Sequence, residues 1–253
     1  MSMFFPSISS ERRVEDFNLQ VARGHVPGHS TVNIYGYQPA VAQTFIPIWE
    51  NATAYVYPVA ATQMHLAGSN GDTATIVISG LNAAYEVISE SVVLNGATPV
   101  TTVNSFLRVN SMVVSVGSAT NPSGTVTLKD LTDTIIYAQI NPGVGRTQMA
   151  IYTVPAGYTF FLSRIDVNTS LNGSNFATYQ NKTTSPAGVV QLTQQAPFAI
   201  NYHTQRVMPR PFAEKTDVQL MAKVNSTTGA ISISQEGYLI KGSAYPAPGT
   251  PWI

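Results

Sequence analysis

The feature that most constrains the fold of this chain is a recurring pattern of short alternating segments separated by turn residues. In TATIVIS (73–79) apolar and polar residues alternate, which is typical of a strand with one buried face and one solvated face. Turn sequences such as SNGD (69–72), NG (95–96) and NPSG (121–124) separate these segments, at a spacing of roughly 8–12 residues. No long helix is predicted after residue 27. The pattern therefore predicts an all-β protein, built as an antiparallel sandwich or barrel.

The strand-like segments fall into two groups, divided near NPGVGR (141–146), where a proline and two glycines interrupt the pattern. We expect two consecutive antiparallel β-sandwich (jelly-roll-like) domains, residues 31–142 and residues 143–242. An extended N-terminal arm, residues 1–30, precedes them, and a Pro-rich C-terminal tail, residues 243–253, follows. A chain of 253 residues is long enough to bury two cores of modest size.

A short corner, VPAGY (154–158), lies inside the second group. Pro155 presets one backbone angle and Gly157 can take a positive φ, so the segment is predicted to be a turn. We expect this turn to join the strands on its two sides as a hairpin at the start of the second core.

The first 30 residues admit two interpretations. Val14, Phe17 and Val21 have helical spacing, which predicts a short helix from Ser10. Phe17, Leu19 and Val21 also alternate, which indicates an extended arm that packs on its own domain or on a neighbouring subunit. The following ARGHVPGHS (22–30) contains a proline and two glycines and is predicted to be a loop. Of the two interpretations we favour the arm.

Composition excludes several classes of function. Charged residues make up 10% of the chain, with 13 acidic and 13 basic, so no long-range field attracts a phosphate backbone and no nucleic-acid partner is expected. The lack of cysteine excludes disulfides, thiolate metal sites and a cysteine nucleophile. No run approaches 18 apolar residues, so we expect no transmembrane helix and no membrane partner. The N-terminus does not resemble a signal peptide, which favours synthesis and assembly in the cytosol.

Candidate chemical groups are few. His25 and His29 are four residues apart, but Pro27 lies between them, so the helix that would align two metal ligands is not expected. Glu86 and Glu90 would share one strand face and could act as an acid–base pair, although a solvated face near a sheet edge is the preferred interpretation. The chain has no Gly-x-Ser-x-Gly elbow and no phosphate-binding loop. We therefore predict no catalytic residue, no metal site and no cofactor.

Aromatic residues are dense between positions 35 and 57. They could form a sugar-binding platform, or a sheet face buried against the arm or another subunit, because tyrosine suits surfaces that are apolar at one end and wet at the other. We favour the second interpretation. The candidate interface residues are Phe17, Leu19, Val21, His25, His29, Tyr35, Tyr37, Trp49, Tyr55 and Tyr57.

Four stretches occur in an order that resembles a known family. They are LQVARGHVPGHSTVNIYGYQ (19–38), SGLNAAYEVISESVVLNGATPVTTVNSFLRVNSM (79–112), MAIYTVPAGYTFFLSRIDV (149–167) and PFAEKTDVQLMAKV (211–224). Together they are similar to a family of tailed-bacteriophage virion structural proteins that is common in phages of marine and aquatic bacteria. The short, Tyr-rich segment after Trp49 is where this chain departs from the family pattern.

The resemblance implies a non-enzymatic protein with β-rich domains, located in a virion that is assembled in the host cytoplasm. The expected partners are copies of the chain itself and other virion proteins, such as the major capsid protein or portal and neck proteins. With the residue pattern, it favours a capsid decoration or cement protein that stabilises the particle as a homo-oligomer. The alternative is a neck or tail-appendage protein that binds a host receptor or glycan.

Overall fold

The computed structural model describes residues 15–51, 53–118, 120–172, 174–225 and 228–242. Part of the predicted arm, residues 1–14, and the predicted tail, residues 243–253, therefore lie outside the described residues. The described chain is all-β, with one short helix and small antiparallel sheets. In order, its elements are α1 (Phe17–Ala22), β1 (His29–Val41), β2 (Ile46–Pro47), β3 (His65–Gly68), β4 (Thr75–Leu81), β5 (Val87–Val93), β6 (Val100–Thr101), β7 (Arg108–Val114), β8 (Val126–Lys129), β9 (Ile136–Ile140), β10 (Ile151–Thr153), β11 (Tyr158–Thr169), β12 (Ala177–Thr184), β13 (Val190–Phe198), β14 (Asn201–Phe212), β15 (Asp217–Val224) and β16 (Gly229–Lys241).

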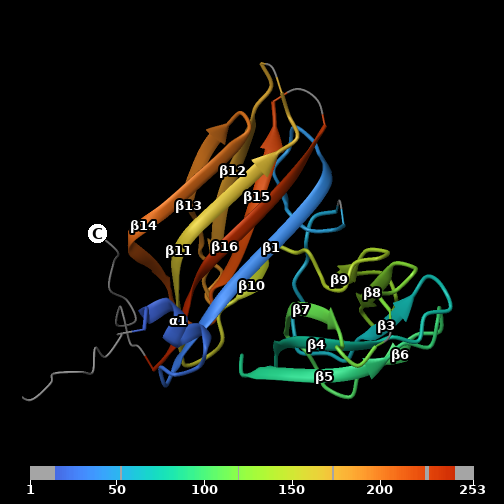
Figure 1. The fold of residues 1–253 in the computed structure, drawn as a ribbon. Coiled ribbons are helices and arrows are strands. Elements are labelled where there is room, and N and C mark those ends of the chain that lie inside the picture. Colours follow the sequence, from blue (N-terminus) through green and yellow to red (C-terminus); the bar gives the residue numbers. More distant parts are fainter. Residues whose placement is uncertain (1–14, 52, 119, 173, 226–227, 243–253) are drawn as a thin grey trace, which may run out of the picture.

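The larger group of strands, which we name the large body, contains two sheets (Figure 1). One has the strand order β1-β16-β11-β14, and we refer to it as the front sheet. The other has the order β10-β15-β12-β13, with β2 paired to β15. Alternate residues of the long strands are buried in one hydrophobic cluster between them, which includes Phe160, Leu162, Tyr179, Leu220 and Ile233.

The smaller group, the small body, contains the sheets β6-β3-β8-β9 and β5-β4-β7 (Figure 1). The alternation of TATIVIS is confirmed, because Ile76 and Ile78 of β4 are fully buried while their neighbours are partly exposed. A second hydrophobic cluster fills this body, and Met64, Phe106 and Met112 are among its largest buried side chains.

The predicted boundary of the first domain is wrong at its N-terminal end. β1 pairs along its length with β16, and β2 pairs with β15, so residues 29–47 lie in the large body rather than in the domain predicted for residues 31–142. The small body is thus inserted between β2 and β10. Alternation determines which face of a strand is buried, but it does not determine which distant strand is its partner.

The predicted extended arm is wrong for residues 17–22, which form the helical alternative, α1. The Asp16 carboxylate accepts hydrogen bonds from the backbone N–H groups of Asn18 and Leu19, at 2.9 and 3.3 Å, and so caps the first turn. Val21 is buried, whereas most of the helix is exposed. The Asp16 cap and the buried side chain of Val21 stabilise the helix, which explains why these residues do not form the extended arm.

The corner at Pro155–Gly157 is a turn, as expected, and Gly157 has a φ of 74°. The expected hairpin is wrong, because β10 pairs with β15 while β11 pairs with β14 and β16 in the front sheet. The turn therefore carries the chain from one sheet of the large body to the other. A corner of this kind and a hairpin turn use the same residue types, so the sequence does not distinguish them.

The chain crosses between the two bodies at two adjacent places. Ile48 belongs to the core of the large body, and the next residue, Trp49, belongs to the core of the small body. On the return, the backbone N–H of Ala150 donates to the carbonyl of Ile48 at 2.8 Å, so the two crossings are hydrogen-bonded to each other. Gly36 of β1 packs against both crossings. A Cβ at this position would lie 2.3 Å from the Ile48 carbonyl oxygen and 2.5 Å from the Ala150 Cβ.

Candidate interaction surfaces

The aromatic cluster at positions 49–57 is internal. Trp49 and Tyr55 are buried, with ring centroids 5.1 Å apart, and Tyr55 and Tyr57 meet at 5.0 Å. Burial raises the pKa of the Tyr55 and Tyr57 hydroxyls above the ordinary value. The predictions of a sugar platform or an intersubunit face are therefore corrected for Trp49 and Tyr55, which are buried within the chain, while Tyr57 is partly buried and packs against the same core. Aromatic density alone does not separate a surface platform from a core.

Beside these rings, Arg108 of β7 forms a buried ion pair with Asp217 of β15, and no local sequence pattern predicts it because the two residues are 109 positions apart. Its Nε donates to Asp217 Oδ1 at 2.8 Å, and its Nη2 donates to Oδ2 at 3.0 Å. The guanidinium carbon lies 4.5 Å from the centroid of the Tyr57 ring. Desolvation lowers the pKa of Arg108, but the hydrogen bonds and charge of Asp217 outweigh it and the pKa is raised. The pair joins the small body to the large body.

The remaining predicted interface residues lie on or beside α1 and β1. Phe17 and Leu19 are 50% and 49% exposed, while Tyr35 and Tyr37 are half-buried on β1. Phe17 contacts the ring of His29, with centroids 6.0 Å apart. The structure thus brings part of this set together near the start of β1, and it separates them from the buried aromatic cluster.

The predicted titratable pairs make separate structural contacts. His25 Nδ1 lies 3.6 Å from a Glu15 carboxylate oxygen, whereas His29 Nδ1 lies 3.1 Å from the Pro27 carbonyl oxygen. Among the described residues, no cluster of three or more His, Asp or Glu side chains could hold a metal ion.

Glu86 and Glu90 also have different surroundings. Glu86 accepts a hydrogen bond from the Asn82 side chain at 2.9 Å. The Glu90 carboxylate accepts from the backbone N–H groups of Val103 and Asn104, at 2.7 and 2.8 Å. Glu90 therefore organises a loop of the small body.

The first candidate surface is an apolar projection at the edge of the large body. Between Leu162 and Arg164 of β11 the register with β14 jumps from Arg210 to Gln205, so residues 206–209 stand opposite Ser163 alone. Val207 and Met208 in this stretch are 99% and 84% exposed. We name residues 206–209 the β14 bulge.

Strand β13 lies beside this bulge and adds another exposed apolar side chain. Arg206 donates to the Gln194 side chain, and Arg210 donates to the Thr193 carbonyl, so two arginines tie β14 to β13. Leu192, next to this contact, is 60% exposed. Large apolar side chains thus gather on neighbouring segments of two edge strands.

The second candidate surface is a polar row across the outer face of the front sheet. In register, Asn33 of β1 stands beside Glu236 of β16, Glu236 beside Arg164 of β11, and Arg164 beside Gln205 of β14. We name these four residues the polar row. An open groove of about 400 Å³ runs over it and is also lined by Tyr238. The sequence did not reveal this row, because its members come from four distant segments.

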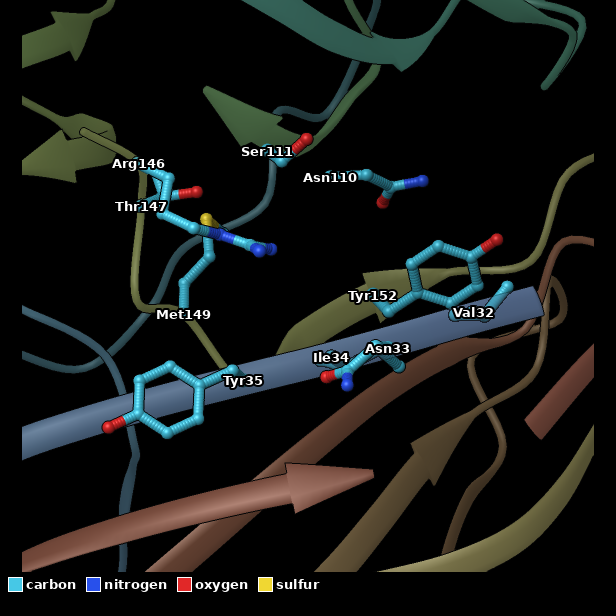
Figure 2. Close-up of a pocket in the computed structure, with 10 residues that line it drawn as sticks. All are labelled: Val32, Asn33, Ile34, Tyr35, Asn110, Ser111, Arg146, Thr147, Met149 and Tyr152. Atoms are coloured by element: carbon cyan, nitrogen blue, oxygen red, sulfur yellow. The ribbon is translucent and has the colours of Figure 1, made fainter. Parts of the chain in front are cut away.

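A smaller pocket, about 110 Å³, lies between β1 and β7 (Figure 2). Figure 2 shows the Arg146 side chain extending into the space between β1 and the segment that carries Asn110 and Ser111. Near this pocket, Glu50 is buried at the crossing between the bodies and accepts a hydrogen bond from the backbone N–H of Gln148. Desolvation raises the pKa of Glu50 to about 7, although this hydrogen bond and the charge of Arg146 act in the opposite direction.

Comparison with known proteins does not assign the chain to a family. No family model matches the chain, and no curated protein matches it. A solved structure of the Gt strain of infectious bursal disease virus is similar at 12% identity and a TM-score of 0.22, covering 87% of this chain and 74% of that chain. A mutant VP2 protein of the same virus, in T=1 particles, is similar at 9% identity and a TM-score of 0.22, covering 90% and 76%. Superposition this weak carries no argument about fold or function.

No helix in the described part of the chain is long and apolar enough to span a membrane.

Proposed function

We propose that the chain is a non-enzymatic structural subunit of a virion that acts through contacts with other subunits. The observation that carries this proposal is the β14 bulge, where Val207 and Met208 project almost fully into solvent. The ordered sequence stretches that resemble tailed-phage virion proteins supply the context. Each body is interpreted as a β-sandwich, since each has two sheets that contribute to one core.

The physical basis is the free energy of apolar burial. Covering apolar surface contributes about 25 cal/mol per Å², before the cost of ordering the partners is subtracted. Burial of Val207, Met208 and Leu192 contributes most, because Val207 and Met208 are the most exposed large apolar side chains of β14 and Leu192 is the most exposed of β13. Edge strands also present unpaired backbone groups that a neighbouring chain can complement. A second copy of this chain is the partner that we assign to the bulge.

Within the virion, we assign the role of capsid decoration or cement, in which many copies multiply modest contacts into a stable shell. A neck or tail position is the alternative, with fewer copies. Portal and neck proteins would then replace the major capsid protein as neighbours.

The interface is tested by sedimentation of the purified full chain over a range of concentrations. We expect the unmodified chain to self-associate and the double variant Val207→Ser/Met208→Ser to remain monomeric. Val116→Ser is the matched control, because Val116 is equally exposed but belongs to a loop of the small body. Association that is the same in the double variant and the control, or a chain that stays monomeric without substitution, would refute the proposed interface.

A further inference from the structure

The polar row on the front sheet has features that its role in the fold does not require. Its four side chains cross all four strands of the sheet in one line, on the face opposite the core. Adjacent strands are about 4.8 Å apart, so the line is about 14 Å long. The groove above it has a volume of about 400 Å³, which is within the range of ligand sites. We propose that this groove binds a neutral saccharide through the polar row and the ring of Tyr238.

The order of hydrogen-bonding groups along the row suits a chain of hydroxyl groups. Asn33 and Gln205, at its two ends, carry amides that both donate and accept, Glu236 accepts, and Arg164 donates. Among the described residues, one weak side-chain hydrogen bond links neighbours in the row, from Asn33 Nδ2 to Glu236 Oε1 at 3.4 Å, and the charges of Arg164 and Glu236 attract each other. The Gln205 side chain has no hydrogen-bond partner among the residues that the structure describes. The polar row therefore has hydrogen-bond donors and acceptors that the fold does not use and that a ligand in the groove could engage.

Tyr238 supplies an apolar surface beside these polar groups. It is two positions from Glu236 on β16, so both side chains lie on the outer face. Its hydroxyl donates to the Asn18 side chain, and its ring meets Phe17 with centroids 5.9 Å apart, so α1 holds the ring in place. A saccharide presents C–H groups on its ring faces and hydroxyl groups at its edge, which matches a fixed aromatic ring beside a polar row.

The charges of the site favour a neutral ligand. Arg164 donates to the Asp166 carboxylate at 2.7 and 3.3 Å, and His203 contacts the same carboxylate. Desolvation raises the pKa of Asp166, but hydrogen bonds from His203 and Arg164 outweigh it and the pKa is lowered, so Asp166 stays ionised. The positive charge of Arg164 is thus balanced, and Glu236 adds a negative charge that repels anions. Phosphate-rich and acidic polymers are therefore disfavoured.

This inference does not depend on the proposed assembly role, because the front-sheet groove and the β14 bulge are formed by different residues. Isothermal titration of the full chain is the test, with maltohexaose, laminarihexaose and chitohexaose as neutral probes and a polygalacturonate hexamer as the acidic probe. We expect saturable binding of at least one neutral probe, and none of the acidic probe.

Glu236→Gln and Gln205→Ala should each weaken that binding about tenfold, because each removes hydrogen bonds to the ligand. Tyr238→Ala should abolish it, with thermal unfolding recorded to show that the variant folds. Gln191→Ala, an exposed glutamine on β13, is the control and should leave the affinity unchanged. Absence of binding to all neutral probes, preference for the acidic probe, or equal affinity of the Glu236 variant and the control would overturn the proposal.

Discussion

Arg108 and Asp217 form a bidentate ion pair, with side chains only 11% and 9% exposed, that links β7 of the small body to β15 of the large body. Thr153 strengthens the link, because its hydroxyl also donates to Asp217 at 2.6 Å. Its backbone N–H donates to the Asn110 side chain at 2.9 Å. This polar contact and the two chain crossings are among the contacts that join the two bodies.

Asp217→Asn should destabilise the protein by about 3–5 kcal/mol, because it leaves the buried charge of Arg108 without its counter-ion. Equilibrium urea unfolding measures the change. Arg23→Gln, which breaks the more exposed pair with Glu15, is the control and should cost no more than about 1 kcal/mol. Similar losses in the two variants would contradict a structural role for the Arg108–Asp217 pair.

Glu50 should make stability depend on pH. Its pKa is raised by desolvation from 4.5 to about 7, so the folded state holds the proton more tightly than the unfolded state. The stabilisation is fully present below pH 4.5 and is lost as the pH rises to 7, a change on the order of 3 kcal/mol.

Urea unfolding at several pH values checks this dependence. Glu50→Gln should remove this part of the fall in stability between pH 4.5 and 7, whereas Glu86→Gln, at an exposed position, should retain it. A Glu50→Gln profile parallel to that of the unmodified chain would show that Glu50 is not the group responsible.

Glu90→Gln should cost about 1–3 kcal/mol, because a carboxylate that accepts two backbone N–H groups is replaced by an amide with one acceptor. Glu86→Gln should change the free energy of unfolding by less than about 0.5 kcal/mol, since Glu86 is exposed. Thermal unfolding of both variants provides the comparison. Equal, negligible effects would mean that the two carboxylates are equivalent surface groups.

Gly36→Ala should destabilise the protein by about 1–3 kcal/mol, because the new Cβ would lie 2.3 Å from the Ile48 carbonyl oxygen and 2.5 Å from the Ala150 Cβ. Gly71→Ala serves as the control, since nothing lies within 4 Å of its added Cβ. We expect the control to remain within about 0.5 kcal/mol of the unmodified chain in urea unfolding. Tolerance of alanine at position 36 would contradict the close packing of the crossings on β1.

The local pattern of the sequence predicts the strands but not their partners. The alternation at 73–79 correctly places Ile76 and Ile78 in a core, because the burial of a strand face is a property of consecutive residues. The pairing of β1 with β16 joins residues about two hundred positions apart, and no local signal specifies it. The insertion of the small body into the large body follows from that pairing.

The candidate surfaces, too, could not be predicted from the local sequence pattern alone. The density of aromatic residues at Tyr55 and Tyr57 does not tell whether their rings meet solvent or pack against the rest of the chain. The polar row depends on the register of four strands, and a shift of one residue would turn its side chains to the core. The exposed Val207–Met208 pair depends on a break in register that the sequence does not mark.

The most direct test of the proposed virion role uses purified particles of a virus whose genome encodes this chain. Quantitative mass spectrometry measures the copy number of the chain in those particles against the major capsid protein. We expect the chain to be present in a fixed ratio to the capsid protein, in many copies for a decoration role. Val207→Ser/Met208→Ser should reduce this ratio. About a dozen copies or fewer would favour the neck or tail position. Absence of the chain from purified particles would refute the proposed virion role.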